Sequence, residues 1–80
     1  MVDFPRFVPS ALDLAWASSL LRCIADDGIW LCPSAELIYT VSHREMMLTL
    51  TLGDADDETH RRNKIVFAKL GYKMKEGICT

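Results

Sequence analysis

Residues 46–52, with the sequence Met-Met-Leu-Thr-Leu-Thr-Leu, are the segment that decides the fold of this chain. Every second position from residue 48 onward is a leucine, and the positions between them are Met47, Thr49 and Thr51. Side chains of a β-strand point alternately to the two faces of its sheet. The alternation therefore predicts a strand over Met46–Leu52, with Leu48, Leu50 and Leu52 on a buried face and the other face exposed.

Two more strands are predicted immediately before this one. Residues 29–32 form an uncharged run, Ile-Trp-Leu-Cys, which Pro33 and Ser34 interrupt. The segment Glu36–Val41 is rich in β-branched and aromatic side chains, which favour strands. The polar residues Ser42–Glu45 are few enough for a tight turn between neighbouring strands. We therefore expect a three-stranded antiparallel meander.

A helix is predicted on the N-terminal side of the meander. Ser10 lies three residues before Asp13, which is the spacing of a capping box with Asp in place of the usual Glu. The apolar side chains that follow share one arc of a helical wheel: Leu14, Trp16, Ala17, Leu20, Leu21 and Ile24. We expect this helix to end near Asp26, with Gly28 as its terminator.

A second helix is predicted over Asp57–Leu70, after the meander. Acidic residues precede and begin it, and negative charge is favourable at the positive end of a helix dipole. Gly71 follows the last apolar position and is expected to close the helix, with Tyr72 as the apolar contact of the cap. The tail Tyr72–Thr80 is expected to form a short strand at a sheet edge.

These elements predict an α+β fold in a single small domain over residues 1–80. Both helices are expected on the leucine face of the sheet, because each layer must bury its apolar side. Pro5 and Pro9 forbid a helix around them and predict an extended arm over residues 1–9. The aromatic rings of this arm, Phe4 and Phe7, are expected to pack on the domain.

Length and composition limit the function. The chain has 80 residues, of which 50% are hydrophobic and 25% are charged, so it holds one core and little room for an enclosed active site. Its longest runs without a charge are eight residues, whereas a membrane-spanning helix needs about 20. The first residues do not have the pattern of a signal peptide. We expect a cytoplasmic protein of the host cell that spans no membrane.

No pattern predicts a metal, a cofactor or a catalytic centre. The two histidines, His43 and His60, stand apart from each other and from the cysteines, without the spacing of zinc ligands. The cysteines, Cys23, Cys32 and Cys79, are read as small buried apolar residues. Acidic residues at 54, 56 and 58 resemble a calcium loop, but the glycine and the distal glutamate of such a loop are missing.

Nucleophilic catalysis would need Ser or Cys beside a base. His43 with Ser42, or His60 with Cys79, could be paired, yet neither lies in a motif such as Gly-x-Ser-x-Gly. The four glycines stand singly, so no phosphate-binding loop is predicted. We therefore expect a protein that is not an enzyme and uses no cofactor.

Charge is unevenly distributed along the chain. Residues 1–58 hold ten acids against three bases, a balance of −7, whereas residues 59–80 hold six bases against one acid, a balance of +5. Separate acidic and basic surfaces are expected. The candidate partner-binding residues are the acids at strand ends and helix starts: Asp26, Asp27, Glu36, Glu45, Asp54, Asp56, Asp57 and Glu58.

A solitary domain of this size, with an α+β plan and an acidic charge over most of its length, resembles the small phage-encoded inhibitors of bacterial defence known as anti-CRISPR proteins. The resemblance implies a stoichiometric inhibitor that binds a protein partner. In that mechanism, acidic side chains stand in for phosphates and occupy the basic groove of a nucleic-acid-handling effector complex.

Two alternatives remain open at this point. The first is a small nucleic-acid-binding or regulatory protein that uses the basic segment Arg61–Lys75. Its phosphate contacts would be Arg61, Arg62, Lys64, Lys69, Lys73 and Lys75. The second is a subunit whose partner covers the exposed face of the sheet, which is expected to be polar. That face would carry Glu36, Thr40, Thr49 and Thr51.

Overall fold

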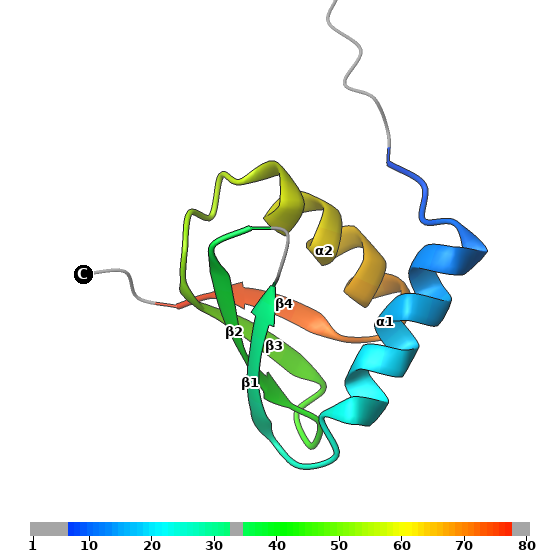
Figure 1. Cartoon of the computed structure of the whole chain (residues 1–80), viewed down its shortest axis with the longest axis horizontal. Helices are drawn as coiled ribbons and strands as arrows, with labels where there is room; N and C mark the ends of the chain where they lie inside the picture. The colour runs from blue at the N-terminus through cyan, green and yellow to red at the C-terminus, as the bar shows by residue number, and fades with distance from the viewer. Residues whose placement is uncertain (1–6, 33–34, 78–80) are drawn as a thin grey trace, which may run out of the picture.

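The computed structural model describes residues 7–32 and 35–77. The elements follow one another as α1 (Ala11–Cys23), β1 (Gly28–Cys32), β2 (Leu37–Ser42), β3 (Met47–Leu52), α2 (Glu58–Lys69) and β4 (Lys73–Glu76). Figure 1 shows their arrangement. The predicted α+β plan of helix, antiparallel meander, helix and short final strand is confirmed.

The four strands form one sheet in the order β1-β2-β3-β4. The first three pair antiparallel through short connections, as predicted. β4 pairs parallel with β3, from Met47 opposite Lys73 to Leu50 opposite Glu76. A parallel neighbour needs a crossover connection, and α2 supplies it.

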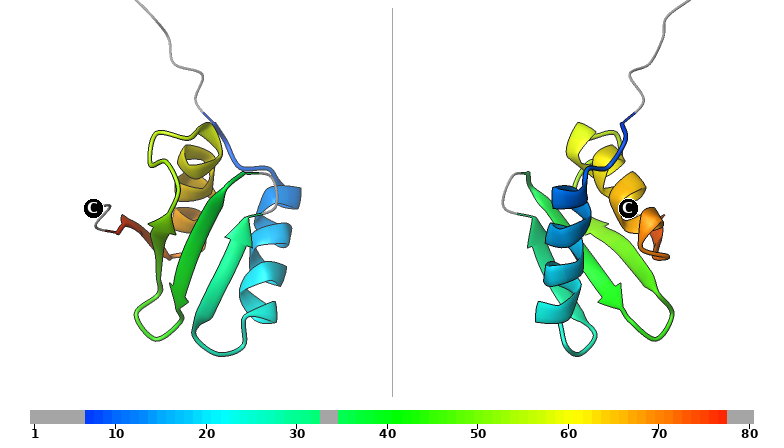
Figure 2. Two further views of the ribbon diagram at one scale, coloured as in Figure 1. Left: turned by 60° about the vertical axis from the view of Figure 1, so that its left-hand side comes forward. Right: turned by 90° about the vertical axis from the view of Figure 1, so that its right-hand side faces the viewer.

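Both helices lie on one face of this sheet, and the opposite face is open (Figure 2). The core between the layers consists of Ala17, Leu21, Trp30, Cys32, Leu37, Tyr39, Val41, Leu48, Leu50, Val66 and Phe67. The rings of Trp30 and Phe67 meet edge to face, with centroids 5.5 Å apart. The predicted leucine face is therefore the helix-covered face for Leu48 and Leu50, both of which are fully buried.

Leu52 does not follow the other two leucines. Tyr39 is opposite Leu50, but its neighbour Ile38 is opposite Leu52, so Thr51 is an extra residue in β3. Such a bulge turns the following side chain to the other face. Leu52 consequently lies on the open face and is 59% exposed. The prediction that it is buried was wrong.

The start of α1 agrees with the sequence and its end does not. The Ser10 hydroxyl accepts from the Asp13 amide and the Asp13 carboxylate accepts from the Ser10 amide, which completes the capping box. The helix stops at Cys23 rather than near Asp26, and Gly28 is the first residue of β1. The His43 ring binds the Ile24 carbonyl at this end of the helix.

The end of α2 is as predicted. The Gly71 amide donates to the Ala68 carbonyl and the Tyr72 amide donates to the Phe67 carbonyl, both over 3.0 Å. Gly71 has a φ of 87°, which is the left-handed conformation that this cap requires. The cap turns the chain back toward the sheet, where β4 begins.

Several smaller expectations have mixed outcomes. Cys32 is buried as predicted, but Cys23 is exposed on the last turn of α1, and Cys79 lies outside the described residues. Phe7 packs partly buried against the core, and residues 7–9 of the predicted arm form neither helix nor strand, whereas residues 1–6, with Phe4, lie outside the described residues. Neither α1 nor α2, the helices of the described part of the chain, has the length and apolar character needed to cross a bilayer.

Candidate functional site

The open face of the sheet is more apolar than the sequence predicted. Ile29 and Leu31 of β1 are 69% and 65% exposed, and the bulge adds Leu52 to the same face. Ile38 lies between them on β2 and is partly exposed. The expected polar residues Thr40 and Thr49 are also on this face, but they occupy its middle rather than its whole area. The prediction of a polar face was therefore wrong for the half nearest β1.

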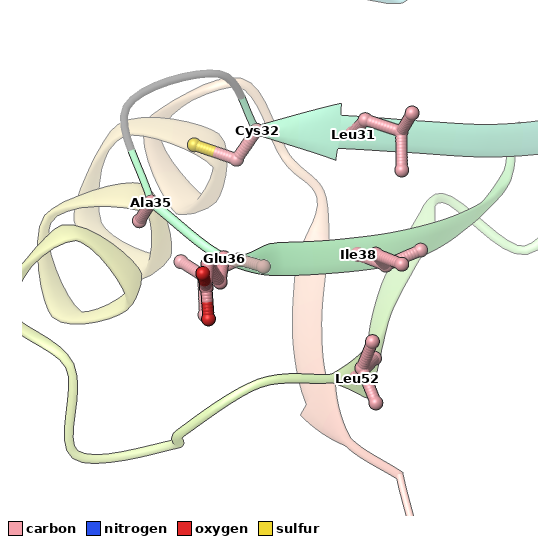
Figure 3. Close-up of a pocket in the computed structure, with 7 residues that line it drawn as sticks. Leu31, Cys32, Ala35, Glu36, Ile38 and Leu52 are labelled. Carbon is pink, nitrogen blue, oxygen red and sulfur yellow. The ribbon is translucent and has the colours of Figure 1, made fainter.

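A shallow groove lies at one end of this apolar half. Its volume is about 350 Å³, and it is lined by Leu31, Cys32, Ala35, Glu36, Leu37, Ile38 and Leu52. Figure 3 shows Leu31, Ile38 and Leu52 in a row across three strands, with Glu36 on the connection directly before β2. The groove therefore joins apolar side chains to one carboxylate at its rim.

The sheet brings the acidic candidates together in two groups rather than one. The connection before β2 lies against the loop after β3. The approach is so close that a Cβ atom added to Gly53 would be 2.7 Å from the Glu36 carbonyl oxygen. We call this end of the sheet the groove end. It holds the larger group of acids: Glu36, Asp54, Asp56, Asp57 and Glu58.

The remaining acidic candidates lie at the opposite end of the sheet, which we call the turn end. The Asp27 carboxylate accepts from the His43 amide at 2.9 Å and so joins the start of β1 to the turn between β2 and β3. Asp26 precedes it, and Glu45 lies in that turn. No single edge therefore gathers all eight acids.

Some acids of the groove end already have local partners. Asp57 caps α2 by accepting from the Thr59 amide at 2.7 Å, and Asp54 accepts from the Asp56 amide at 2.8 Å. The Asp56 carboxylate is 4.0 Å from the Arg61 guanidinium, and both side chains are largely exposed. Within residues 7–32 and 35–77, Glu36 and Glu58 form no hydrogen bond or ion pair through their carboxylates. These two are the most available to a partner.

The basic candidates do not form one continuous surface. Arg62 pairs with Asp13, and Lys64 pairs with Glu76, so part of the charge on α2 is neutralised locally. Lys73 and Lys75 are opposite Met47 and Thr49 in the register of β4, which places them on the open face, across the sheet from α2. The open face of the described strands carries no aromatic ring, since Trp30 and Tyr39 point into the core. A platform for stacking nucleic-acid bases is therefore missing there.

A buried polar cluster lies under α2, and sequence reasoning missed it. His60 is fully buried, and its Nδ1 is 2.7 Å from the Tyr39 hydroxyl while its Nε2 is 3.1 Å from the Glu76 carboxylate. Asn63 donates its side-chain amide to the same hydroxyl over 3.2 Å. The spacing of His60, Asn63 and Phe67 along one side of α2 was the available signal, because three and seven residues return a helix to the same face.

Two different causes shift the pKa values of Glu76 and Tyr39 in this cluster. The Lys64 ammonium and then the His60 ring bind the Glu76 carboxylate, which lowers its pKa to about 2. Burial raises the pKa of the Tyr39 hydroxyl to about 12. With a carboxylate on Nε2, the ring donates there and accepts from the Tyr39 hydroxyl at Nδ1. The cluster therefore ties β2, α2 and β4 together.

The histidines are thus held in structural contacts. The ring of His43 binds the Tyr72 hydroxyl at 3.0 Å and the Ile24 carbonyl, so it does not face Ser42 as a base would. The other pairing considered from the sequence is His60 with Cys79, and Cys79 lies outside the described residues. In the described ranges, no three His, Cys, Asp or Glu side chains converge as metal ligands would.

Comparison with protein-family models, with curated proteins and with solved structures finds no match for this chain. The chain forms an α+β domain with one face covered by helices and an open face that is apolar toward β1. The groove, with Glu36 at its rim, is the candidate functional site.

Proposed function

We propose that this protein is a non-catalytic binding protein that takes a segment of a protein partner into the groove. The segment would present an apolar side chain flanked by Lys or Arg. The observation that supports the proposal is the position of the groove at the same end of the sheet as five acidic residues. Apolar contact and charge attraction would act together at one place.

The two contributions have different roles. Burial of an exposed Leu or Ile side chain contributes up to about 1.5–3 kcal/mol, so Leu31, Ile38 and Leu52 would supply most of the affinity. The carboxylates of Glu36 and Glu58 would mainly speed association and select a basic partner. Their contribution falls as salt is added, because exposed charges are screened.

Proteins that handle nucleic acids bind phosphates through Lys and Arg side chains, and such side chains would also suit the acidic groove end. We therefore propose stoichiometric inhibition of such a protein, the relation expected from the anti-CRISPR resemblance. The carboxylates of the groove end would occupy the positions of phosphates, and the groove would add an apolar anchor that phosphates lack. This anchor would favour the inhibitor over nucleic acid at raised salt.

Selection from a random peptide library displayed on phage tests the proposal, with the immobilised protein as bait. Enriched peptides are expected to carry an apolar residue flanked by Lys or Arg. In a nuclear magnetic resonance titration, the peptide should shift the amide signals of Leu31, Ile38 and Leu52. Enrichment of acidic peptides, or signal changes confined to the turn end, would overturn the proposal.

Matched charge reversals provide the control. Glu36→Lys places a positive charge at the groove, whereas Glu45→Lys makes the same change at the turn end. We expect the first variant to weaken peptide binding by about tenfold and the second to leave it nearly unchanged. Equal losses would assign the effect to net charge alone. Tight binding of duplex or single-stranded DNA or RNA at physiological salt, lost on joint Lys73→Glu and Lys75→Glu substitution, would favour the nucleic-acid alternative instead.

A further inference from the structure

The two edges of the sheet differ in how they are protected. β4, at one edge, has the sequence Lys-Met-Lys-Glu, so three of its four residues are charged. β1, at the other edge, is Gly-Ile-Trp-Leu-Cys and carries no charge and no proline. Charged residues on an edge strand discourage pairing with another chain, and an uncharged apolar edge permits it. β1 is the edge open to pairing.

From Gly28 to Leu31, the outer side of β1 faces no other strand of the described part of the chain. β2 is the strand neighbour on its inner side, and the helices lie on the core face. In a sheet edge, alternate residues direct their backbone N–H and C=O groups away from the neighbouring strand. These groups are available to an added strand.

We propose that the partner segment binds in extended form, as a fifth strand added along β1. This inference rests on the proposed function and specifies its binding mode. An added strand places every second side chain on the open face, beside Ile29 and Leu31. Apolar residues spaced two apart would then extend the apolar half of that face and reach the groove next to Leu31.

Charge identifies the occupant as a basic segment rather than a second copy of this chain. Acids bracket β1, with Asp26 and Asp27 immediately before it and Glu36 at the end of the connection that follows it. A strand with Lys or Arg at both ends complements them. Antiparallel pairing of two β1 strands would instead bring Asp26 and Asp27 of each copy toward Glu36 of the other, which is repulsive.

A designed peptide tests this binding mode directly. The probe is Lys-Thr-Val-Thr-Val-Thr-Lys, with both ends blocked, which has apolar residues two apart and a base at each end. Amide hydrogen exchange followed by nuclear magnetic resonance should show slower exchange within Gly28–Cys32 when the probe is bound. Exchange within Lys73–Glu76 should not change, because that edge is charged.

Three matched peptides separate the contributions. N-methylation at alternate residues along either edge keeps the side chains but removes the donors of that edge. We expect the version methylated on the pairing edge to bind about tenfold or more weakly and the other to bind like the probe. A peptide with Glu in place of both Lys residues should bind no more tightly than the peptide that is methylated on the pairing edge.

Each result has a distinct meaning. Slower exchange in β1 together with loss on methylation of one edge only supports strand addition. If both methylated peptides bind like the probe, or if β1 exchange is unchanged while groove signals shift, strand addition is wrong and groove binding stands. If neither this probe nor any library peptide binds, the proposed function fails and this inference fails with it.

Discussion

The Tyr39 hydroxyl is where three hydrogen-bonding side chains of the core meet. It accepts from Asn63 and contacts His60, whose other ring nitrogen reaches Glu76. No side-chain N or O that is buried in the described residues lacks a hydrogen-bond partner. Polar groups in a core are tolerated only when satisfied in this way, because an unpaired buried group loses its contacts with water without compensation.

Tyr39→Phe should therefore destabilise the protein by about 1–3 kcal/mol, because it leaves His60 and Asn63 buried with one partner fewer. Urea unfolding followed by circular dichroism measures this loss. Tyr72→Phe is the control, since its hydroxyl bonds the partly buried His43 and its loss should cost less. Equal stability of Tyr39→Phe and the unsubstituted protein would show that the cluster contributes nothing.

Gly53 allows the loop after β3 to lie against the connection before β2. Its φ is 125°, and an added Cβ would lie 2.5 Å from the Leu37 side chain as well as against the Glu36 carbonyl. Gly53→Ala should destabilise the fold by more than about 1 kcal/mol through strain and collision. Thermal unfolding would report a lower midpoint. Gly28→Ala meets only contacts of 3.5 Å or more and should have a smaller effect.

At the scale of elements, β3 shows what a sequence pattern can and cannot predict. Alternation correctly placed Leu48 and Leu50 in the core, because a regular strand has a period of two. It failed at Leu52, since the bulge at Thr51 breaks the period without a glycine or another sequence signal. The Thr51 hydroxyl bonds the Ile38 carbonyl at 2.9 Å, a contact that depends on the neighbouring strand.

The same substitution at two positions of β3 tests this assignment. Leu50→Ala should cost about 2–5 kcal/mol, because the side chain is fully buried. Leu52→Ala should destabilise the protein much less than Leu50→Ala, because the Leu52 side chain is mostly exposed. Chemical unfolding of both variants decides the matter. A larger loss of stability for Leu52→Ala than for Leu50→Ala would contradict the bulge at Thr51.

The helices were predictable where local chemistry decides their ends. The capping box of Ser10 and Asp13 and the Gly71 cap depend on residues close in sequence, and both were predicted. α1 ends at Cys23 with its Ile24 carbonyl bound by His43, a contact with a residue distant in sequence that the helix pattern does not reveal. His60 was missed because a polar residue is ordinarily assigned to the surface.

At the scale of the whole molecule, the candidate site was only partly predictable. The acidic excess of residues 1–58 is visible in the sequence, but its division between the groove end and the turn end is set by which connections lie together. The groove itself was not predicted, because Leu52 reaches it only through the bulge. A surface assembled from three strands has no continuous signature along the chain.

Low pH should lower the free energy of unfolding through protonation of Glu76. Its pKa is lowered to about 2, so its ion pair with Lys64 and its bond to His60 stabilise the folded state above the ordinary carboxyl range near 4.5. This contribution is lost as the pH falls toward 2. Glu76→Gln should be less stable than the unsubstituted protein at pH 7, and the difference should shrink as the pH falls.

Unfolding by urea across this pH range provides the measurement. Glu45→Gln, in the exposed turn between β2 and β3, is the matched control and should show nearly the same pH dependence as the unsubstituted protein. A stability difference for Glu76→Gln that stays constant from pH 7 to the acid limit would contradict the assignment.

The parallel pairing of β4 with β3 also affects the order in which the sheet forms. The meander joins strands that are neighbours in sequence and can form from local contacts, whereas β4 pairs with β3 only after α2 has crossed between them. Until residues 73–76 pair with β3, that strand keeps an unpaired edge and His60 lacks Glu76. Pairing of β4 is therefore expected to be the late step that closes this edge and ends the period in which it could pair with another chain.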